Sequence, residues 1–264
     1  MEGISFIGAG NMAYAIVNGY IRKNAAETVG VYDISEERRK IFSDMGCRVM
    51  EDYKKAAEFA KYIVLCVKPQ TIETVLEGIR EYITEEKVII SIVAGVSAEY
   101  IQEKIGFECK VVRTMPNTPL LIGYGATAVS DTGNLTEEEF ETAQELFKSA
   151  GKTAKIPSEL MNEVVALNGS SPAYIYLFAK VFVDKAQEMG INRESARELF
   201  CETLIGSAKM MMESGKSEEE LIKMVCSPGG TTLSGLEELK KNNFEESLEK
   251  CIEACVKRAY EIGR

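Results

Sequence analysis

The chain has 264 residues, of which 45% are hydrophobic and 27% charged, and it contains no histidine and no tryptophan. The missing histidine excludes a Ser-His or Cys-His nucleophile, a histidine general base and any zinc site with a histidine ligand. No apolar stretch reaches the roughly 18 to 20 uncharged residues of a membrane span. Length and composition therefore predict a soluble globular protein with one large domain or two ordinary ones.

The net charge at pH 7 is −10, and acidic residues are in excess in both halves of the chain. Because a phosphate backbone would be repelled, we expect no nucleic-acid partner. The seven cysteines are an odd number and are scattered, and no secretory signal is recognised at the N-terminus, which favours reduced thiols in a cytoplasm. Cys251 and Cys255 are too few for a closed zinc site, so we expect no metal.

The first 157 residues alternate short strand-like runs with helix-like segments. The strand-like runs are continuously apolar and rich in β-branched residues, which is typical of strands buried on both faces. They are Ile4–Ile7, Val29–Tyr32, Tyr62–Val67, Val88–Val93, Lys110–Arg113, Ala126–Val129 and Thr153–Ile156. Helical patterns lie between them at Asn11–Lys23, Ser35–Met45, Thr71–Tyr82, Ala98–Ile105 and Glu137–Ser149. This alternation predicts an α/β domain with a doubly wound parallel sheet over residues 1–157.

After Pro157 the pattern becomes entirely helical. The expected helices are Met161–Ala166, Ala173–Met189, Arg193–Met212, Glu219–Val225, Leu233–Lys241 and Glu245–Ile262. Residues 158–264 are therefore predicted to form an all-α C-terminal domain. Its segment Ala173–Val183 is apolar on every face except at Lys180, and such a helix must be covered all round. Since a domain of about 100 residues has difficulty surrounding a helix alone, we expect a second copy to cover it, in a homodimer.

A glycine-rich turn follows the first predicted strand and opens the first predicted helix. Gly8-Ala9-Gly10-Asn11-Met12-Ala13 has the G-x-G-x-x-A form of the dinucleotide fingerprint. Gly8 allows the tight turn, Gly10 allows a pyrophosphate to approach the backbone, and Ala13 allows close packing of helix on sheet. The context at the start of a βαβ unit predicts a Rossmann-type site for NAD(P)H, with phosphates at a helix N-terminus.

Asp33 ends the second predicted strand, 20 residues after Ala13. An acidic residue at this place commonly binds the adenosine ribose hydroxyls and disfavours a 2′-phosphate, which favours NADH over NADPH. Arg38 and Arg39 follow closely and are within reach of a phosphate. A structural role for Asp33, as a turn residue before the helix cap Ser35, is the alternative.

Further turns follow other predicted strands. Val67-Lys68-Pro69, Ala94-Gly95 and Met115-Pro116-Asn117-Thr118-Pro119 all lie where ligands bind in open α/β sheets, outside the carboxyl ends of strands. We therefore expect these turns to surround the cofactor. Alternatively, Lys68 is a solvated strand end and Asn117 caps a turn.

The segment Ser227-Pro228-Gly229-Gly230-Thr231-Thr232 opens the predicted helix that begins at Leu233. Two glycines followed by two hydroxyls offer backbone N–H groups to an anion and a hydroxyl to a polar atom beside it. A simple interhelical turn has little need for this combination, so the segment is a second candidate binding site.

Together these motifs resemble pyrroline-5-carboxylate reductase, the last enzyme of proline biosynthesis. The resemblance covers the whole chain through Phe6–Met12, Val67–Gln70, Ala94–Val96, Met115–Pro119, Gly169–Tyr174, Gly206–Met210 and Cys226–Thr232. The last segment is the most specific. The family often has Ser where this chain has Asn168, and often has a Ser/Arg-type loop for a 2′-phosphate where this chain has Asp33.

The resemblance implies hydride transfer from NAD(P)H to the imine carbon of 1-pyrroline-5-carboxylate, giving L-proline. It implies that Ser227, Gly230 and Thr231 hold the substrate carboxylate, that Thr232 bonds the ring nitrogen, and that Asn117 lies at the substrate. It also implies a dimer with interleaved helical domains, often assembled further into decamers. Because an imine can be protonated before the hydride arrives, this chemistry needs no histidine.

Two other classes share parts of the pattern. A β-hydroxyacid dehydrogenase has the same two-domain plan, but Lys180 is out of register for that family's catalytic lysine. A non-catalytic NAD(P)-binding redox sensor would have no evident use for the Ser227–Thr232 turn.

Overall fold

The computed structural model describes residues 3–263, which form two compact units. Within that range the first unit consists of residues 3–172 and 254–263, and the second of Ala173–Glu253. The 3₁₀ turn at Ser158–Leu160 and the π-helical turn at Val165–Gly169 thus belong to the first unit, where the π turn packs against two strands of the sheet. A functional boundary at residue 157 remains a prediction. The predicted fold class, a Rossmann-type α/β domain followed by helices, is confirmed.

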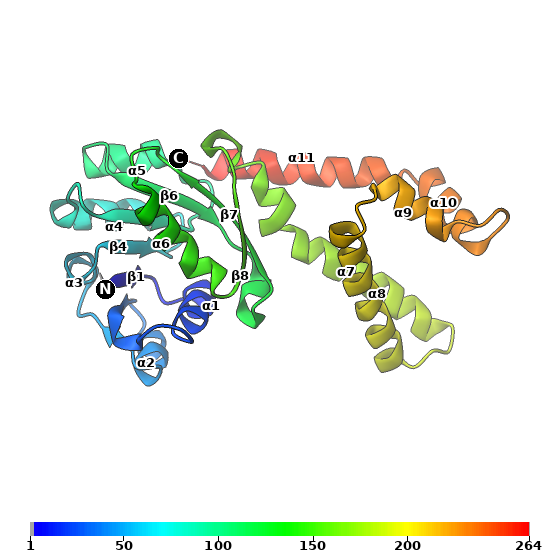
Figure 1. Ribbon diagram of the computed structural model, residues 1–264, viewed down its shortest axis with the longest axis horizontal. Helices are drawn as coiled ribbons and strands as arrows, with labels where there is room; N and C mark the ends of the chain where they lie inside the picture. Colours follow the sequence, from blue (N-terminus) through cyan, green and yellow to red (C-terminus); the bar gives the residue numbers. More distant parts are fainter. Residues whose placement is uncertain (1–2, 264) are drawn as a thin grey trace. The chain divides into compact units, whose positions relative to one another are not determined.

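An eight-stranded sheet forms the centre of the first unit (Figure 1). The strand order is β3-β2-β1-β4-β5-β6-β7-β8, and every pair is parallel except β6 with β7. The strands are β1 (Ile4–Ile7), β2 (Val29–Tyr32), β3 (Arg48–Val49), β4 (Tyr62–Leu65), β5 (Val88–Ser91), β6 (Lys110–Met115), β7 (Gly125–Asp131) and β8 (Gly151–Lys155). The strand order reverses direction at β1, so the carboxyl ends of β1 and β4 form the switch point at which such sheets bind ligands.

Helices cover both faces of the sheet. They are α1 (Asn11–Tyr20), α2 (Glu36–Asp44), α3 (Tyr53–Phe59), α4 (Ile72–Ile79), α5 (Ala98–Ile105) and α6 (Glu137–Lys148). Alternate residues of the buried strands supply two separate cores, because successive side chains of a strand point to opposite faces. Phe6 and Val64 belong to the core with α1 and α6, whereas Ile7 and Leu65 belong to the core with α3, α4 and α5.

Four elements of this unit differ from the sequence prediction. The two-residue β3 and the short α3 were not predicted, because both β3 side chains are exposed and give no apolar run. The strand β7 runs antiparallel to β6, since the tight 3₁₀ turn at Thr118–Ile122 reverses the chain between them. The α-helix predicted at Met161–Ala166 is wrong, because this segment begins as a turn and runs into the π-helical turn Val165–Gly169.

The second unit is helical throughout its described residues. It contains most of α7 (Ser171–Glu188), all of α8 (Arg193–Glu213), α9 (Glu218–Val225) and α10 (Thr231–Lys241), and the first half of α11 (Phe244–Ile262). An aromatic cluster joins these helices: the Phe182 and Phe200 rings stack with centroids 4.5 Å apart, and Phe178 contacts both rings and Phe244. Among the described residues, no helix is both long and apolar enough to cross a membrane.

The apolar helix α7 is largely uncovered within the single chain. Leu177 is 63% exposed, Val181 59% and Tyr176 61%, although all three are apolar or aromatic. Exposed apolar side chains on adjacent turns of one helix make a surface that is unfavourable in water. The single chain therefore leaves an apolar surface of α7 exposed.

Candidate functional site

The glycine turn after β1 is held between the ends of two other strands. The Gly8 N–H donates to the Tyr32 carbonyl at the end of β2, at 2.8 Å. Gly8 has φ +102°, and a Cβ at this position would lie 2.6 Å from the carbonyl oxygen of Cys66, just after β4. Both the positive φ and the close backbone approach require glycine. The predicted role of Gly8 in a tight turn therefore has a clear structural basis.

The start of α1 leaves backbone N–H groups free for an anion. Gly10 is the N-cap residue, no side chain caps the helix, and its first turn contains no acidic residue. A Cβ at Gly10 would meet no atom within 4 Å, so the space beside the turn is open. Free N–H groups and the helix dipole favour a phosphate at this position. Ala9 and Gly10, together with the uncapped N–H groups of Asn11 and Met12, thus form a cradle that fits the pyrophosphate of a dinucleotide.

Asp33 connects this cradle to the turn after β2. One carboxylate oxygen accepts a hydrogen bond from the backbone N–H of Ala9 at 2.7 Å, and the other accepts from the N–H of Ser35 at 2.8 Å. Ser35 in turn caps α2 through a bond from the Arg38 N–H to its hydroxyl. Asp33 therefore fixes the position of the glycine turn, a structural role that the spacing rule for ribose binding does not include.

The turns after β4 and β5 lie at the same edge of the sheet. Lys68, between Val67 and Pro69, is exposed, and its carbonyl accepts hydrogen bonds from the N–H and the hydroxyl of Thr71. Ala94 is half-buried and packs beside Met115 at the end of β6. The parallel strands thus bring these segments and the glycine turn to one edge.

Gly95 adopts φ +75° and contacts the C-terminal end of the chain. A Cβ at Gly95 would lie 3.0 Å from the Gly263 Cα and 3.1 Å from the Ala259 carbonyl oxygen. The last turn of α11 therefore packs directly on the turn after β5. No sequence pattern predicts this contact, because it joins segments about 165 residues apart.

Asn117 and Asn168 lie together near the end of β6. The Asn117 side-chain oxygen accepts a hydrogen bond from the Ala126 N–H at 2.9 Å. The Asn168 amide nitrogen donates to the Ala126 carbonyl at 3.0 Å and to the Met115 carbonyl at 2.6 Å. Asn117 was predicted to lie at the substrate; its side-chain oxygen serves the backbone, and its amide nitrogen makes no hydrogen bond among the described residues. Asn168 therefore supports the backbone at Met115 and Ala126, a role that could not be predicted from the sequence.

The Ser227–Thr232 turn lies in the second unit and leads into α10. Gly229 has φ +69°, which favours glycine, and a Cβ at Gly230 would overlap the Ser227 hydroxyl unless that side chain rotated. Gly230 is the N-cap of α10 and no side chain caps this helix. The N–H groups of Thr231 and Thr232 are consequently at an uncapped helix N-terminus, which suits a small carboxylate.

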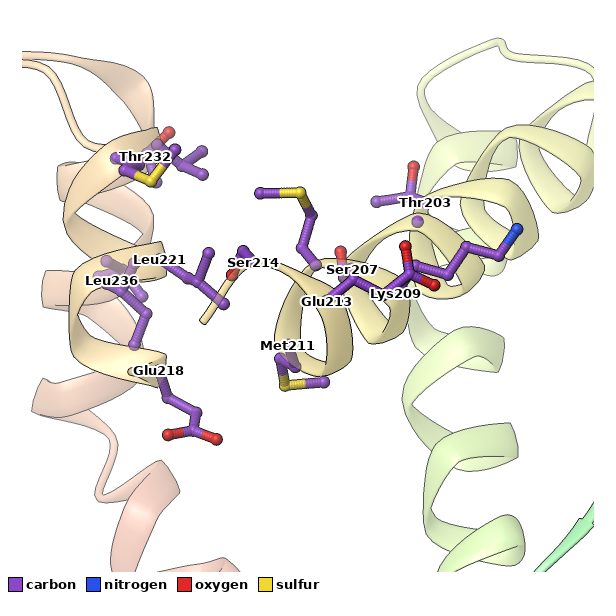
Figure 2. Close-up of a pocket in the computed structure, with 15 residues that line it drawn as sticks. Thr203, Ser207, Lys209, Met211, Glu213, Ser214, Glu218, Leu221, Thr232 and Leu236 are labelled. Carbon is purple, nitrogen blue, oxygen red and sulfur yellow. The ribbon is translucent and has the colours of Figure 1, made fainter. Parts of the chain in front are cut away.

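Thr232 also lines an apolar groove within the second unit (Figure 2). The groove has a volume of about 1080 Å³ and lies between α8 on one side and α9 with α10 on the other. Figure 2 shows Met211 of α8 across the groove from Leu221 of α9 and Leu236 of α10. A groove of this size with apolar walls is suited to receive bulky apolar side chains.

Comparisons with protein families match both parts of the chain. Residues 158–262 match the family model described as pyrroline-5-carboxylate reductase dimerisation. Residues 3–95 match the model described as NADP oxidoreductase coenzyme F420-dependent.

Curated relatives extend over nearly the whole chain. It is 33% identical to the pyrroline-5-carboxylate reductase of Aquifex aeolicus, covering 98% of this chain and 97% of the relative. It is 34% identical to that of Methanosarcina acetivorans, covering 99% of this chain and 98% of the relative.

Solved structures give the same result. A pyrroline-5-carboxylate reductase from Coxiella burnetii superposes with a TM-score of 0.91 at 32% identity, covering 100% of this chain and 99% of the other. The Plasmodium falciparum enzyme, solved with NADP bound, has a TM-score of 0.91 at 29% identity and covers 100% of this chain and 98% of the other.

Proposed function

We infer that this chain, which belongs to the pyrroline-5-carboxylate reductase family, reduces pyrroline-5-carboxylate to proline with a nicotinamide dinucleotide, the last step of proline biosynthesis. The observation that carries this function is the extent of the match. Relatives of this activity align over 98% and 99% of the chain, so both the glycine turn and the Ser227–Thr232 turn are inside the aligned region.

We propose that the dinucleotide binds along the carboxyl edge of the sheet. When bound, its reduced nicotinamide supplies the hydride. The pyrophosphate would lie at Gly8, Ala9, Gly10, Asn11 and Met12, and the remaining contacts would come from Asp33, Val67, Lys68, Pro69, Ala94 and Gly95. The carboxylate of Asp33 favours ribose hydroxyls over a 2′-phosphate, which supports a preference for NADH.

We propose that the substrate carboxylate binds at the N-terminus of α10. Ser227, Gly230 and Thr231 would hold it there, because uncapped backbone N–H groups stabilise a small anion without any arginine. Thr232 would bond the ring nitrogen, and the unbonded amide nitrogen of Asn117 is available to a polar atom of the substrate. Protonation activates the carbon–nitrogen double bond, so these residues orient the substrate and exclude water from it.

We propose that two copies of the chain interleave their helical domains. The match to a dimerisation family supports association, and the exposed face of α7 together with the apolar groove between α8, α9 and α10 supports its form. The apolar side chains of α7 from one copy would be buried against the second. We also propose that these dimers assemble further into decamers. We propose a cytoplasmic location, because it suits the seven free thiols.

Steady-state kinetics with pyrroline-5-carboxylate test the function, using NADH and NADPH in parallel. The purified protein should oxidise at least one of them only when the imine is present, with the higher kcat/KM for NADH. A panel of 2-keto acids is the control, since a β-hydroxyacid dehydrogenase would act on related substrates. Failure to oxidise either dinucleotide with the imine would contradict the proposal.

A further inference from the structure

The C-terminal end of α11 packs on the turn after β5 through close main-chain contacts. A Cβ on Gly263 would lie 2.9 Å from the Gly95 carbonyl oxygen, and one on Gly95 would lie 3.0 Å from the Gly263 Cα. Ala259, on the last turn of the helix, is buried. Because no side chain lies between the two glycines, a shift of the helix end would also shift the turn. The conformation of the Ala94–Gly95 turn therefore depends on how the end of α11 is held.

A side-chain hydrogen bond ties this helix end to the rest of the first unit. The Tyr260 hydroxyl donates to Oε1 of Glu163 at 2.6 Å, between residues that are 97 positions apart in the sequence. The Oε2 atom of Glu163 is buried and has no hydrogen-bond partner within residues 3–263. Burial of a carboxylate is unfavourable unless a donor offsets it. The hydroxyl of Tyr260 supplies such a donor to Glu163.

Neighbouring groups do not replace that bond. Arg113 donates to a backbone carbonyl at 3.1 Å and to the Asn162 side-chain oxygen at 3.4 Å. Earlier on α11, the Cys255 thiol donates to the Ser170 hydroxyl, with 3.3 Å between Sγ and Oγ. Loss of the Tyr260 bond would thus loosen the last turn of α11, while Cys255 still holds the helix more than one turn earlier.

The turn held in this way lies where the nicotinamide half of the dinucleotide belongs in the proposed binding mode. The pyrophosphate is assigned to the glycine turn after β1, and the adenosine ribose to Asp33 after β2. In the sheet order β2-β1-β4-β5, the nicotinamide half then extends to the other side of β1, over the ends of β4 and β5. Gly95, which follows β5, is thus a neighbour of the nicotinamide rather than of the adenosine.

We propose that Tyr260 is a positioning residue for the nicotinamide half of the cofactor. Through Glu163 it holds the end of α11 against the Ala94–Gly95 turn, and this keeps the turn in the conformation that receives the ring. This role rests on the proposed function for the ligand and for its direction across the sheet. The glycine turn after β1 is held by other contacts, from Tyr32 and Asp33, so loss of the Tyr260 bond should affect one half of the dinucleotide and not the other.

Two ligands that differ only at the nicotinamide end test this role, by calorimetric titration without substrate. The first is the reduced dinucleotide that the wild type binds more tightly, NADH or NADPH. The second is its fragment without nicotinamide, ADP-ribose or the 2′-phosphate of ADP-ribose. For Tyr260→Phe we expect the Kd of the dinucleotide to rise about three- to tenfold, because binding must then order a loosened turn. The Kd of the fragment should change by less than about twofold.

Two further variants separate this hydrogen bond from other effects. Glu163→Ala should raise the Kd of the dinucleotide in the same way, and the double variant should bind as tightly as Tyr260→Phe does, because both changes break one bond. Tyr82→Phe is the matched control, because it removes a tyrosine hydroxyl from a 3₁₀ turn of the first unit outside this contact. It should change neither Kd.

The role of Tyr260 would be overturned by equal weakening of the dinucleotide and the fragment, which would indicate a general loss of structure. No weakening of either ligand, or a further loss of affinity in the double variant, would overturn it as well. None of these results contradicts the proposed reductase. A wild-type protein that binds neither NADH nor NADPH would instead contradict the proposed function, and this role with it.

Discussion

Asn117 and Asn168 bind opposite ends of one residue, since Asn117 accepts from the N–H of Ala126 and Asn168 donates to its carbonyl. The reason lies in the sheet. Antiparallel pairing with β6 ends where Met115 faces Ala128, so Ala126 lies two residues beyond the last strand partner on that side. The two side-chain amides thus supply the hydrogen-bond partners that a neighbouring strand would otherwise provide to the backbone of Ala126.

Replacing either asparagine should destabilise the fold, and the two effects should be coupled. Asn168→Ala removes two donors to backbone carbonyls, and Asn117→Ala removes an acceptor, so each should lower the free energy of unfolding by about 1 to 3 kcal/mol. The double variant should lose less than the sum, because both side chains hold the same residue. Urea unfolding of the four proteins measures the coupling. Strictly additive losses would show that the two residues act independently.

The sheet could be predicted because its signal is local. Continuous apolar runs such as Ile4–Ile7 and Val88–Ser91 are visible in any short window, and they indicate strands buried on both faces. Arg48–Val49 could not be found, because a two-residue edge strand with exposed side chains carries no such pattern. The segment Thr118–Ile122 contains turn-forming residues, but they do not predict the reversal of chain direction that makes β7 antiparallel.

In the candidate site, too, some features could be predicted from the sequence and others could not. Gly8 and Gly229 were found from the sequence because their positive φ angles, and at Gly8 the close approach of the Cys66 backbone, restrict these positions to glycine. Gly10 and Gly230 belong to the same motifs but have ordinary φ angles. The partners of Asp33, Asn117 and Gly95 could not be found, since they lie 24, 9 and about 165 residues away and depend on the assembled sheet. Sequence motifs thus predicted the two glycine-rich turns, while the contacts that support them needed the structure.

Thr232 is expected to act on turnover rather than on cofactor affinity. Thr232→Ala should lower kcat with pyrroline-5-carboxylate by roughly 10- to 100-fold, because it removes the hydroxyl proposed to bond the ring nitrogen. The Kd for the dinucleotide should stay within twofold. Thr232→Ser, which keeps the hydroxyl, should recover most of the activity, and Ser234→Ala on the same helix serves as the control. Unchanged kinetics in Thr232→Ala would remove this residue from the mechanism.

Gly95→Ala should destabilise the fold more than a glycine-to-alanine substitution in an open turn does. A methyl group at Gly95 meets both a φ of +75° and the last turn of α11, whereas Gly133 has a φ of +78° with nothing within 4 Å. We expect Gly133→Ala to cost about 1 kcal/mol and Gly95→Ala about 2 to 4 kcal/mol, since the second adds a backbone clash to the strain. Thermal unfolding compares the two variants. Equal losses would show that the contact with α11 contributes nothing.

A charge on the exposed face of α7 should separate the proposed dimer. Val181→Glu places a carboxylate in a surface that is 59% exposed in the single chain and is proposed to be buried between copies. Burying an unpaired charge costs several kcal/mol, so the variant should sediment with the mass of one chain at micromolar concentration. Val49→Glu, at an exposed apolar position in the first unit, is the control and should sediment like the wild type. A Val181→Glu protein of unchanged mass would contradict the proposed interface.

Glu139 links the amino ends of two strands to α6. Its carboxylate is only 6% exposed and accepts hydrogen bonds from Lys110 at 2.8 Å and from the Thr136 N–H at 3.0 Å, with Lys61 at 3.3 Å. Burial alone raises the pKa of this carboxyl, but the bonds from Lys110, Thr136 and Lys61 outweigh it and lower the pKa from 4.5 to about 2. The ionised form therefore stabilises the folded state.

This shift makes part of the stability of the first unit depend on pH. Between pH 4.5 and about 2 the unfolded chain binds the proton of Glu139 more readily than the folded chain, so stability is present above this window and is lost as the pH falls through it.

Glu139→Gln should lower the free energy of unfolding by roughly 2 to 3 kcal/mol at pH 7 and by much less near pH 2, because the wild type has by then lost the same interaction. Urea unfolding of both proteins across this range measures the difference. Glu145→Gln is the control, because Glu145 is an exposed residue of the same helix that pairs with Lys148. It should lower the free energy of unfolding by almost nothing at either pH. A Glu139→Gln deficit that stays constant from pH 7 to pH 2 would show that the loss comes from packing rather than from the charge.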